Sequence, residues 1–218
     1  MSDRVAGPTA PFYTFDPIKG EGFDALIAAL KTPRDNDELD TFLEIYPEIR
    51  KVLEKEGADC SNGAANISWD SATILFVAYR ETQSDGSPGL PLERGISMER
   101  LGRFPTKDGN AIAYLRANLR ENKDSQIMAP LLDQLDIGLR NESIGDNSLS
   151  EGFAGLTLHG WLSATQVGEL RLALQKSKWK VANNEEFDGG VADVARHLLI
   201  ILKSAEKRRC GILMRAHS

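Results

Sequence analysis

Three histidines carry most of the side-chain chemistry that this chain of 218 residues offers. Asp193 and His197 are four residues apart, so on a helix the carboxylate and the imidazole project from nearly the same side. Such a pair can bind zinc or another divalent ion when His159 or His217 completes the set of ligands. A hydrogen bond between Asp193 and His197 along the helix explains the same spacing without a metal. Because no motif joins the other histidines to this pair, the sequence predicts neither a bound metal nor a cofactor.

The segment Leu158-His159-Gly160-Trp161-Leu162 is a second candidate. It places a histidine and a tryptophan directly before a predicted helix, where they could line a pocket or an interface. Trp161 could equally cover the core where that helix begins. Arg215 and His217 form a third group, because alternate residues of a strand share one face. The candidate binding residues are therefore His159, Trp161, Asp193, His197, Arg215 and His217.

The sequence has no signature of a common catalytic site. Neither of its two cysteines, Cys60 and Cys210, has the neighbouring base and orienting group that a cysteine nucleophile needs. No Gly-x-Ser-x-Gly elbow, Walker sequence or dinucleotide-binding fingerprint occurs. Gly189-Gly190 before a helix resembles half of an anion cradle, but the acidic residues around it would repel a phosphate. These observations favour a role in binding over catalysis.

Composition and charge limit the class of protein. A hydrophobic content of 41% with 27% charged residues is ordinary for a globular protein, and no apolar stretch is long enough to cross a bilayer. Two widely separated cysteines favour a reducing compartment, so we expect a cytoplasmic location. The net charge of −6 makes nucleic acid an unlikely partner.

The charge is unevenly distributed along the chain. Residues 1–57 carry 7 Lys and Arg against 12 Asp and Glu, whereas residues 171–218 carry 10 against 5. Such asymmetry is compatible with an electrostatic match inside the chain, with head-to-tail self-association, or with no function at all.

The first quarter of the chain is predicted to form an arm followed by helices. Three prolines make residues 1–20 an extended arm. Apolar spacing predicts a helix over Phe23 to Leu30, and Asp35 to Glu38 starts a further helical segment with acidic residues at the positive end of its dipole. Pro47 divides that segment into two helices, or one kinked helix, ending near Gly57.

The central part combines one apolar run with long loops. Ser71 to Tyr79 is rich in β-branched and aromatic residues, which predicts a buried strand. Frequent Gly and Pro predict a loop from Glu81 to Asp108. Helices are expected from Asp108, as the cap, to about Arg120, and from Pro130 to Leu139. A second loop, Arg140 to Gly155, precedes a brief strand.

The C-terminal part contains the most clearly specified elements. Ser163 and Gln166 have the spacing of a capping box for a helix that ends near Lys176. A long amphipathic helix with Asp188 as its N-cap leads into a strand ending at His217. We expect burial of Val194, Leu198, Leu202, Ile212 and Met214, and a wetter environment for Arg215 and His217.

These elements predict an α+β fold that is rich in helices. Its small sheet should include the C-terminal strand and Ala72 to Tyr79. Residues 1–57 should form the arm and a helical lobe, and residues 58–218 the α+β core.

For function, the sequence favours a non-enzymatic cytoplasmic protein that regulates or inhibits a protein partner, or that associates with itself. The alternative is a metal-assisted or acid–base hydrolase that uses Asp193 and His197 together with His159 or His217.

Overall fold

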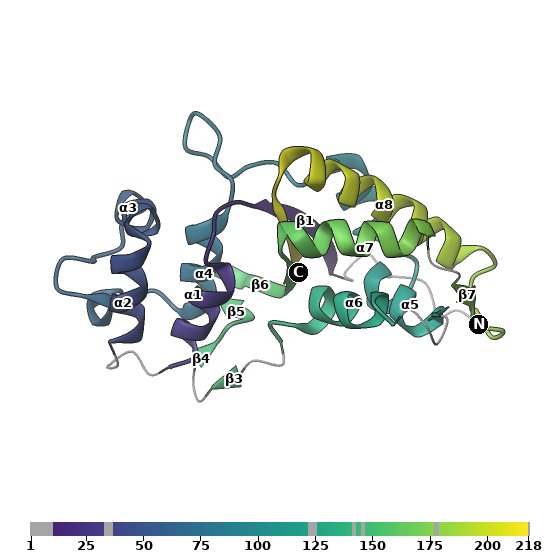
Figure 1. The fold of residues 1–218 in the computed structure, drawn as a ribbon, viewed down its shortest axis with the longest axis horizontal. Helices are drawn as coiled ribbons and strands as arrows, with labels where there is room; N and C mark the ends of the chain where they lie inside the picture. The colour runs from purple at the N-terminus through teal and green to yellow at the C-terminus, as the bar shows by residue number, and fades with distance from the viewer. Residues whose placement is uncertain are drawn as a thin grey trace.

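A four-stranded antiparallel sheet, in the order β1-β8-β6-β5, organises the fold (Figure 1). The structure is a computed structural model that describes residues 11–32, 37–121, 126–140, 143–144, 147–176 and 179–217. The predicted C-terminal strand is confirmed, and it lies at the centre of the sheet between β1 and β6. The strands are β1 (Phe12–Ile18), β5 (Glu151–Gly152), β6 (Leu156–Leu162) and β8 (Gly211–His217).

Helices from the C-terminal half cover one face of this sheet. Side chains alternate along a strand, and the directly paired Phe15 and Met214 both point into the core beneath these helices. The residues predicted to be buried here are buried: Val194, Leu198, Leu202, Ile212 and Met214. The helices are α5 (Ala111–Asn118), α6 (Met128–Ile137), α7 (Ala164–Lys176) and α8 (Gly190–Arg208).

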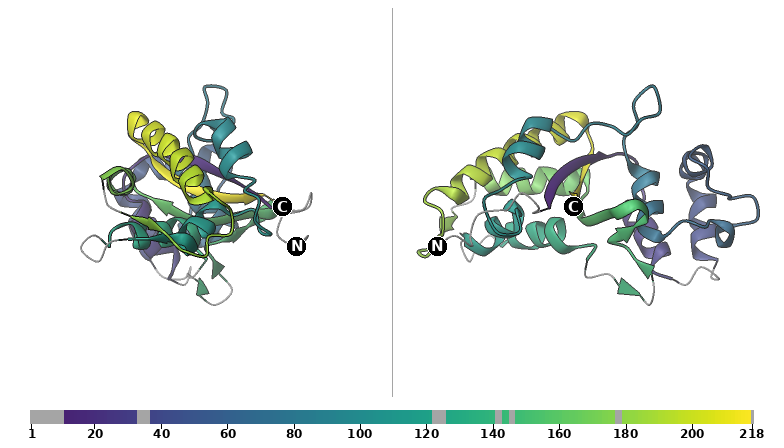
Figure 2. Two further views of the ribbon diagram at one scale, coloured as in Figure 1. Left: turned by 90° about the vertical axis from the view of Figure 1, so that its right-hand side faces the viewer. Right: turned by 180° about the vertical axis from the view of Figure 1, so that it is seen from behind.

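Helices from the N-terminal half form a second core against the opposite face, where Leu158 and Leu213 point. The predicted first helix is confirmed, and Pro47 divides the next segment as expected because it occupies the first turn of a new helix. The helices are α1 (Phe23–Leu30), α2 (Glu38–Ile45), α3 (Pro47–Lys55) and α4 (Ser71–Tyr79). The sheet therefore lies between two groups of helices (Figure 2).

The prediction of a strand over Ser71 to Tyr79 is wrong, because this segment forms α4. The side chain of Asp70 accepts a hydrogen bond from the Thr73 backbone N–H at 2.7 Å and caps the helix. Nearly every residue of α4 is buried, so the helix has no polar side to reveal its 3.6-residue period. A buried run of nine mostly apolar residues fits a helix as well as a strand.

The N-terminal arm enters the sheet. Residues 1–10 of the predicted arm, and Asp35 and Asn36 of the predicted helix start, lie outside the described residues. Residues 12–18 form the edge strand β1, which pairs with β8 along its whole length. The division into an N-terminal lobe and a core at residue 57 stays a prediction.

The helix starts follow local hydrogen bonding. The capping box is confirmed: Gln166 N–H donates to Ser163 Oγ at 3.2 Å, and Ser163 N–H donates to Gln166 Oε1 at 2.9 Å. The prediction of Asp188 as N-cap is wrong, since Gly189 takes that position with φ 76°. Glu185 instead accepts from the Val191 N–H at 2.6 Å, and so places its carboxylate at the start of α8.

The cap of α5 is also shifted from its predicted position. Asn110, and not Asp108, accepts the N–H groups of Ile112 and Ala113, each at 3.0 Å. Asp108 supports this cap by accepting from the Asn110 N–H at 3.2 Å.

Short elements complete the fold. None of the helices in the described ranges is long and apolar enough to cross a membrane. The loop after α4 projects from the molecule (Figure 1) and returns through a π-helical turn. The remaining elements are η1 (Ala64–Asn66), η2 (Ile96–Leu101), β2 (Leu119–Arg120), β3 (Ser143–Ile144), β4 (Asn147–Ser148), η3 (Phe153–Gly155) and β7 (Lys180–Val181).

Candidate binding sites

Asp193 and His197 lie side by side on α8, as their spacing predicts. The His197 Nδ1 atom is 3.4 Å from Asp193 Oδ2, and Arg196 forms an ion pair with the same carboxylate. Burial of the imidazole lowers the pKa of His197, although the Asp193 carboxylate acts in the opposite direction. The pair is therefore a local contact on the side of the helix.

Neither of the other histidines completes a metal site with this pair. His159 contacts Asp136 beneath the C-terminal helices, whereas His217 contacts Thr14 on the opposite face of the sheet. In the part of the chain that the structure describes, no group of three or more His, Cys, Asp or Glu residues could hold a metal ion. The set of ligands required by the metal-assisted alternative is not assembled.

Arg215 and His217 share one face of β8 and are partly exposed, as predicted. Arg215 Nε lies 2.7 Å from Asp16 Oδ2, and its guanidinium lies 4.9 Å from the centre of the Phe76 ring. His217 Nε2 is 2.9 Å from the Thr14 hydroxyl. These contacts join β8 to β1 and to α4, so both side chains have structural partners within the chain.

Trp161 connects β6 to α1. Its indole N–H donates to Asp24 Oδ1 at 3.0 Å, and its ring lies 5.7 Å from that of Phe23. These contacts are those of the structural alternative, in which Trp161 covers the edge of the core. His159 and Trp161, which are close in sequence, therefore contact different helices.

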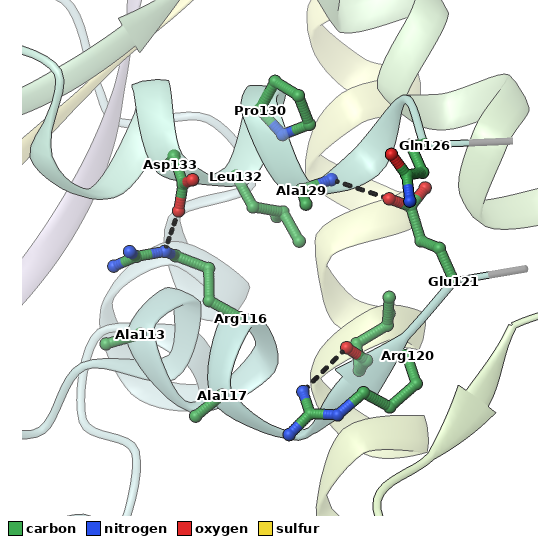
Figure 3. A pocket seen from close by; sticks show the side chains of 11 residues that line it. Ala113, Arg116, Ala117, Arg120, Glu121, Gln126, Ala129, Pro130, Leu132 and Asp133 are labelled. Atoms are coloured by element: carbon green, nitrogen blue, oxygen red, sulfur yellow. Dashed lines mark hydrogen bonds and ion pairs between the residues drawn. The ribbon is translucent and has the colours of Figure 1, made fainter. Parts of the chain in front are cut away.

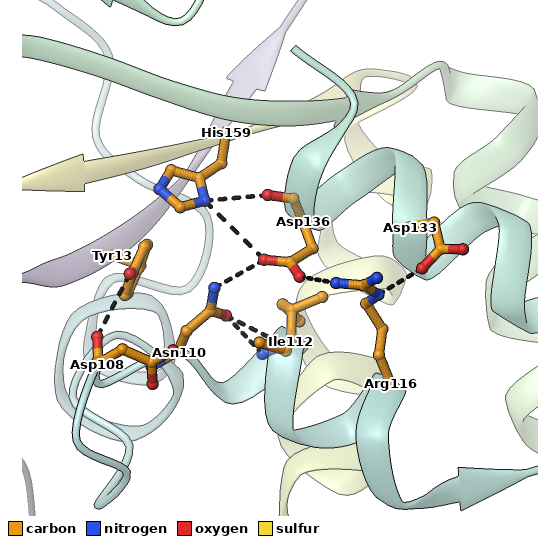
Figure 4. A network of polar contacts seen from close by, with 9 residues as sticks. Tyr13, Asp108, Asn110, Ile112, Arg116, Asp133, Asp136 and His159 are labelled. Atoms are coloured by element: carbon orange, nitrogen blue, oxygen red, sulfur yellow. Dashed lines mark hydrogen bonds and ion pairs between the residues drawn. The ribbon is translucent and has the colours of Figure 1, made fainter. Parts of the chain in front are cut away.

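A buried carboxylate that is not among the residues predicted from the sequence organises a network of polar contacts (Figure 4). Asp136 is 2% exposed. Its Oδ1 atom accepts from Asn110 Nδ2 at 2.7 Å, and its Oδ2 atom forms an ion pair with Arg116. The backbone carbonyl of Asp136 lies 3.0 Å from His159 Nδ1. The network thus joins α5, α6 and β6.

The ionisation of Asp136 follows from these contacts. Burial opposes the charged form, but the nearby His159 imidazole and the hydrogen bonds from Asn110 and Arg116 outweigh it and lower the pKa of Asp136. Because this carboxylate is buried and fully engaged, it has the properties of a structural anchor and not of an acid or base open to a substrate.

A pocket of about 670 Å³ opens beside this network, between α5 and α6 (Figure 3). This volume lies in the range of small-molecule sites. Leu119 and Leu132 give the pocket an apolar side, and the charged residues at its wall are Arg116, Arg120, Glu121 and Asp133. Glu121 is already engaged, because its carboxylate accepts the N–H groups of Met128 and Ala129 at the start of α6.

Arg120, which lines this pocket, faces a second cation on the neighbouring strand. Arg120 of β2 is the direct antiparallel partner of Lys180 of β7, and like charges in such a pair destabilise a sheet. We expect Arg120→Glu to raise the free energy of unfolding by about 0.5 kcal/mol, because it replaces repulsion with an exposed ion pair. Urea unfolding measures this change, with Lys203→Glu on α8 as the control. An equal effect of both variants would show that the Arg120–Lys180 pair is not the cause.

The most exposed large apolar side chain in the described ranges belongs to Phe153, at 82%. It lies in the tight turn between β5 and β6. The Phe153 N–H donates to Asp70 Oδ2 at 2.9 Å and lies 3.1 Å from Thr73 Oγ1. A Cβ atom at Gly152 would lie 2.8 Å from Asp70 Oδ1, so the glycine permits this close approach. The turn is therefore fixed to the N-terminus of α4 while its aromatic ring points to solvent.

The two partly buried histidines predict how stability depends on pH. Burial lowers the pKa of both His197 and His217 below the ordinary value of 6.5. A histidine whose pKa is lower in the folded state than in the unfolded state stabilises the fold at a pH above its unfolded-state pKa. This stabilisation is lost as the pH falls through the folded-state pKa. We therefore expect the free energy of unfolding to be lower at about pH 5.5 than at about pH 7.5. Urea titrations measure the free energy of unfolding at both pH values. The difference between the two pH values should be smaller for the His197→Gln/His217→Gln variant than for the wild-type protein, and an unchanged difference would assign the effect to other groups.

Comparison with known proteins gives no relative: no protein-family model, no curated protein and no solved structure matches this chain.

Proposed function

We propose that this chain is a non-enzymatic protein-binding protein and that Phe153 is the anchor of its binding surface. The observation that carries this proposal is an aromatic ring that is 82% exposed on a turn fixed by hydrogen bonds to α4. Burying such a ring in a partner contributes about 1.5–3 kcal/mol. Aromatic anchors of this kind dominate the energetics of many protein interfaces.

The anchored turn makes Phe153 a favourable contact residue. Association loses free energy when side chains and loops become ordered. The Phe153 backbone is already held by Asp70 and Thr73, and a phenylalanine side chain has only two rotatable bonds to fix. Little ordering is then needed when a partner binds.

The remaining chemistry supports binding over catalysis. Asp136 and His159 are buried within their network, and Asp193 is paired with Arg196. The thiols of Cys60 and Cys210 are also buried, which raises the pKa of each. Buried free thiols support a reducing compartment, and we place the protein in the cytoplasm on that basis.

The partner that we propose has an apolar pocket for Phe153 and a positively charged surface. The chain has a net charge of −6. On α2 and α3, the exposed Glu38, Glu44 and Glu48 form no ion pair with any other described residue. Such charges accelerate association with a basic protein.

The experiment compares Phe153→Ser with Leu172→Ser, which alters an exposed leucine on α7. Each tagged protein is used to capture partners from an extract of the cells that produce it, and the recovered partner is then purified and titrated calorimetrically. We expect Phe153→Ser to weaken affinity at least about tenfold and Leu172→Ser to change it less than about twofold. Unfolding of both variants is measured to exclude a loss of structure.

Two results would reject the proposal. One is unchanged affinity of the Phe153→Ser variant, and the other is an equal loss in the Leu172→Ser variant. Size-exclusion chromatography of the purified chain tests a second copy as the partner, since self-association through this surface would be lost in Phe153→Ser alone.

A further inference from the structure

Arg120 lines the pocket between α5 and α6, and it also lines a neighbouring shallow pocket together with a second cation, Lys180. Arg120 and Lys180 are directly paired across β2 and β7 and are both exposed. Neither forms an ion pair within the described residues, and Arg120 Nη1 donates to the carbonyl of Leu119 at 3.2 Å. Since no described carboxylate forms an ion pair with either of them, the two opposed cations create a local positive potential that an anion would relieve.

The surroundings of this pair provide more donors. Asn183 and Asn184, whose side-chain amides can donate, line a shallow pocket of about 390 Å³ with Arg120 and Lys180. Arg120 also lines the larger pocket between α5 and α6 (Figure 3). The guanidinium therefore lies between a polar surface and a partly apolar pocket.

The other charged side chains of the larger pocket have partners within the chain. Arg116 forms ion pairs with Asp133 and Asp136. The carboxylate of Glu121 accepts two backbone N–H groups at the start of α6. Arg120 is thus the cation of this pocket that has no ion-pair partner among the described residues, while Leu119, Leu132 and Pro130 offer apolar contacts.

We propose that this pocket binds a small organic anion with a flat apolar body. The anionic group lies between Arg120 and Lys180, where the planar guanidinium can donate two parallel hydrogen bonds to a carboxylate, sulfonate or phosphate. The apolar body enters the space between α5 and α6 and covers Leu119 and Leu132. This site is independent of Phe153, so either proposal can fail without the other.

A pair of fluorescent probes tests both halves of the site. The first is 8-anilinonaphthalene-1-sulfonate, which is anionic, and the second is N-phenyl-1-naphthylamine, which has a similar aromatic body without the charge. Both are titrated against the full chain and against the Arg120→Gln/Lys180→Gln variant. We expect the variant to bind the sulfonate about tenfold more weakly and the neutral probe with less than about a twofold change.

Two further variants complete the test. Lys203→Gln/Lys207→Gln removes the same charge from exposed positions on α8 and should leave both affinities unchanged. Ala129→Trp fills the pocket from its α6 side and should weaken both probes about tenfold or more. The proposal is overturned if the two double variants have equal effects on the sulfonate, or if Ala129→Trp alters neither affinity.

Discussion

Replacing Asp136 with alanine should lower the free energy of unfolding by about 3–5 kcal/mol, because it removes one partner of a buried, hydrogen-bonded charge pair. Arg116 would lose its buried partner, and the Asn110 amide that now donates to Asp136 Oδ1 would be left without an acceptor. Chemical denaturation followed by circular dichroism measures the change. The free energy of unfolding of Asp136→Asn should lie between those of the wild-type protein and the alanine variant, since the amide retains the shape of the side chain and one hydrogen-bond acceptor.

Asp133 provides a matched control. It pairs with the same guanidinium, but 53% of its side chain is exposed. Exposed ion pairs contribute about 0–1 kcal/mol, so Asp133→Ala should have little effect. Equal destabilisation by the two alanine variants would contradict the assignment of Asp136 as the anchor of the network.

Gly160→Ala should also lower the free energy of unfolding strongly, by about 3 kcal/mol or more. The added Cβ atom would overlap backbone atoms, and no change of side-chain rotamer can relieve such an overlap. A Cβ atom at this position would overlap the Gln134 carbonyl oxygen and lie 2.7 Å from that of Leu135. Strand β6 and helix α6 would have to separate. Thermal and urea unfolding of the variant measure this cost.

Gly168→Ala is the control for the added methyl group. Gly168 lies inside α7, and its nearest neighbour would be Glu206 Oε1 at 3.7 Å. Alanine is the better helix former, so this change should stabilise the protein by about 0.5–1 kcal/mol. If Gly160→Ala were tolerated equally well, the close contact of β6 with α6 would not be a constraint on the fold.

The elements that the sequence predicts correctly are those specified by local interactions. The capping box of Ser163 and Gln166 involves only neighbouring residues. The alternation in β8 places Met214 in the core and leaves Arg215 partly exposed. In contrast, α4 has hydrophobic residues on all sides, so the 3.6-residue period of a helix cannot be recognised in its sequence.

The candidate sites were harder to predict because they depend on distant segments. The network of Asp136 requires contacts across 26 residues to Asn110 and 23 residues to His159. One sequence signal is present: Asp136 follows Met128 and Leu132 at intervals of four residues and so shares their buried face of α6. The sequence gives no such signal for the exposure of Phe153, since an isolated phenylalanine in a glycine-rich loop could equally be buried.

The most direct test of protein binding through Phe153 is a site-specific crosslink. Phe153 is replaced with the photo-crosslinking analogue p-benzoylphenylalanine, whose aromatic ring takes the same place on the turn, and Leu172 is replaced likewise for comparison. After irradiation in the producing cells, the proposal predicts one dominant adduct with a defined protein from position 153 and none from position 172. The absence of an adduct at position 153, or the same adducts at both positions, would contradict it.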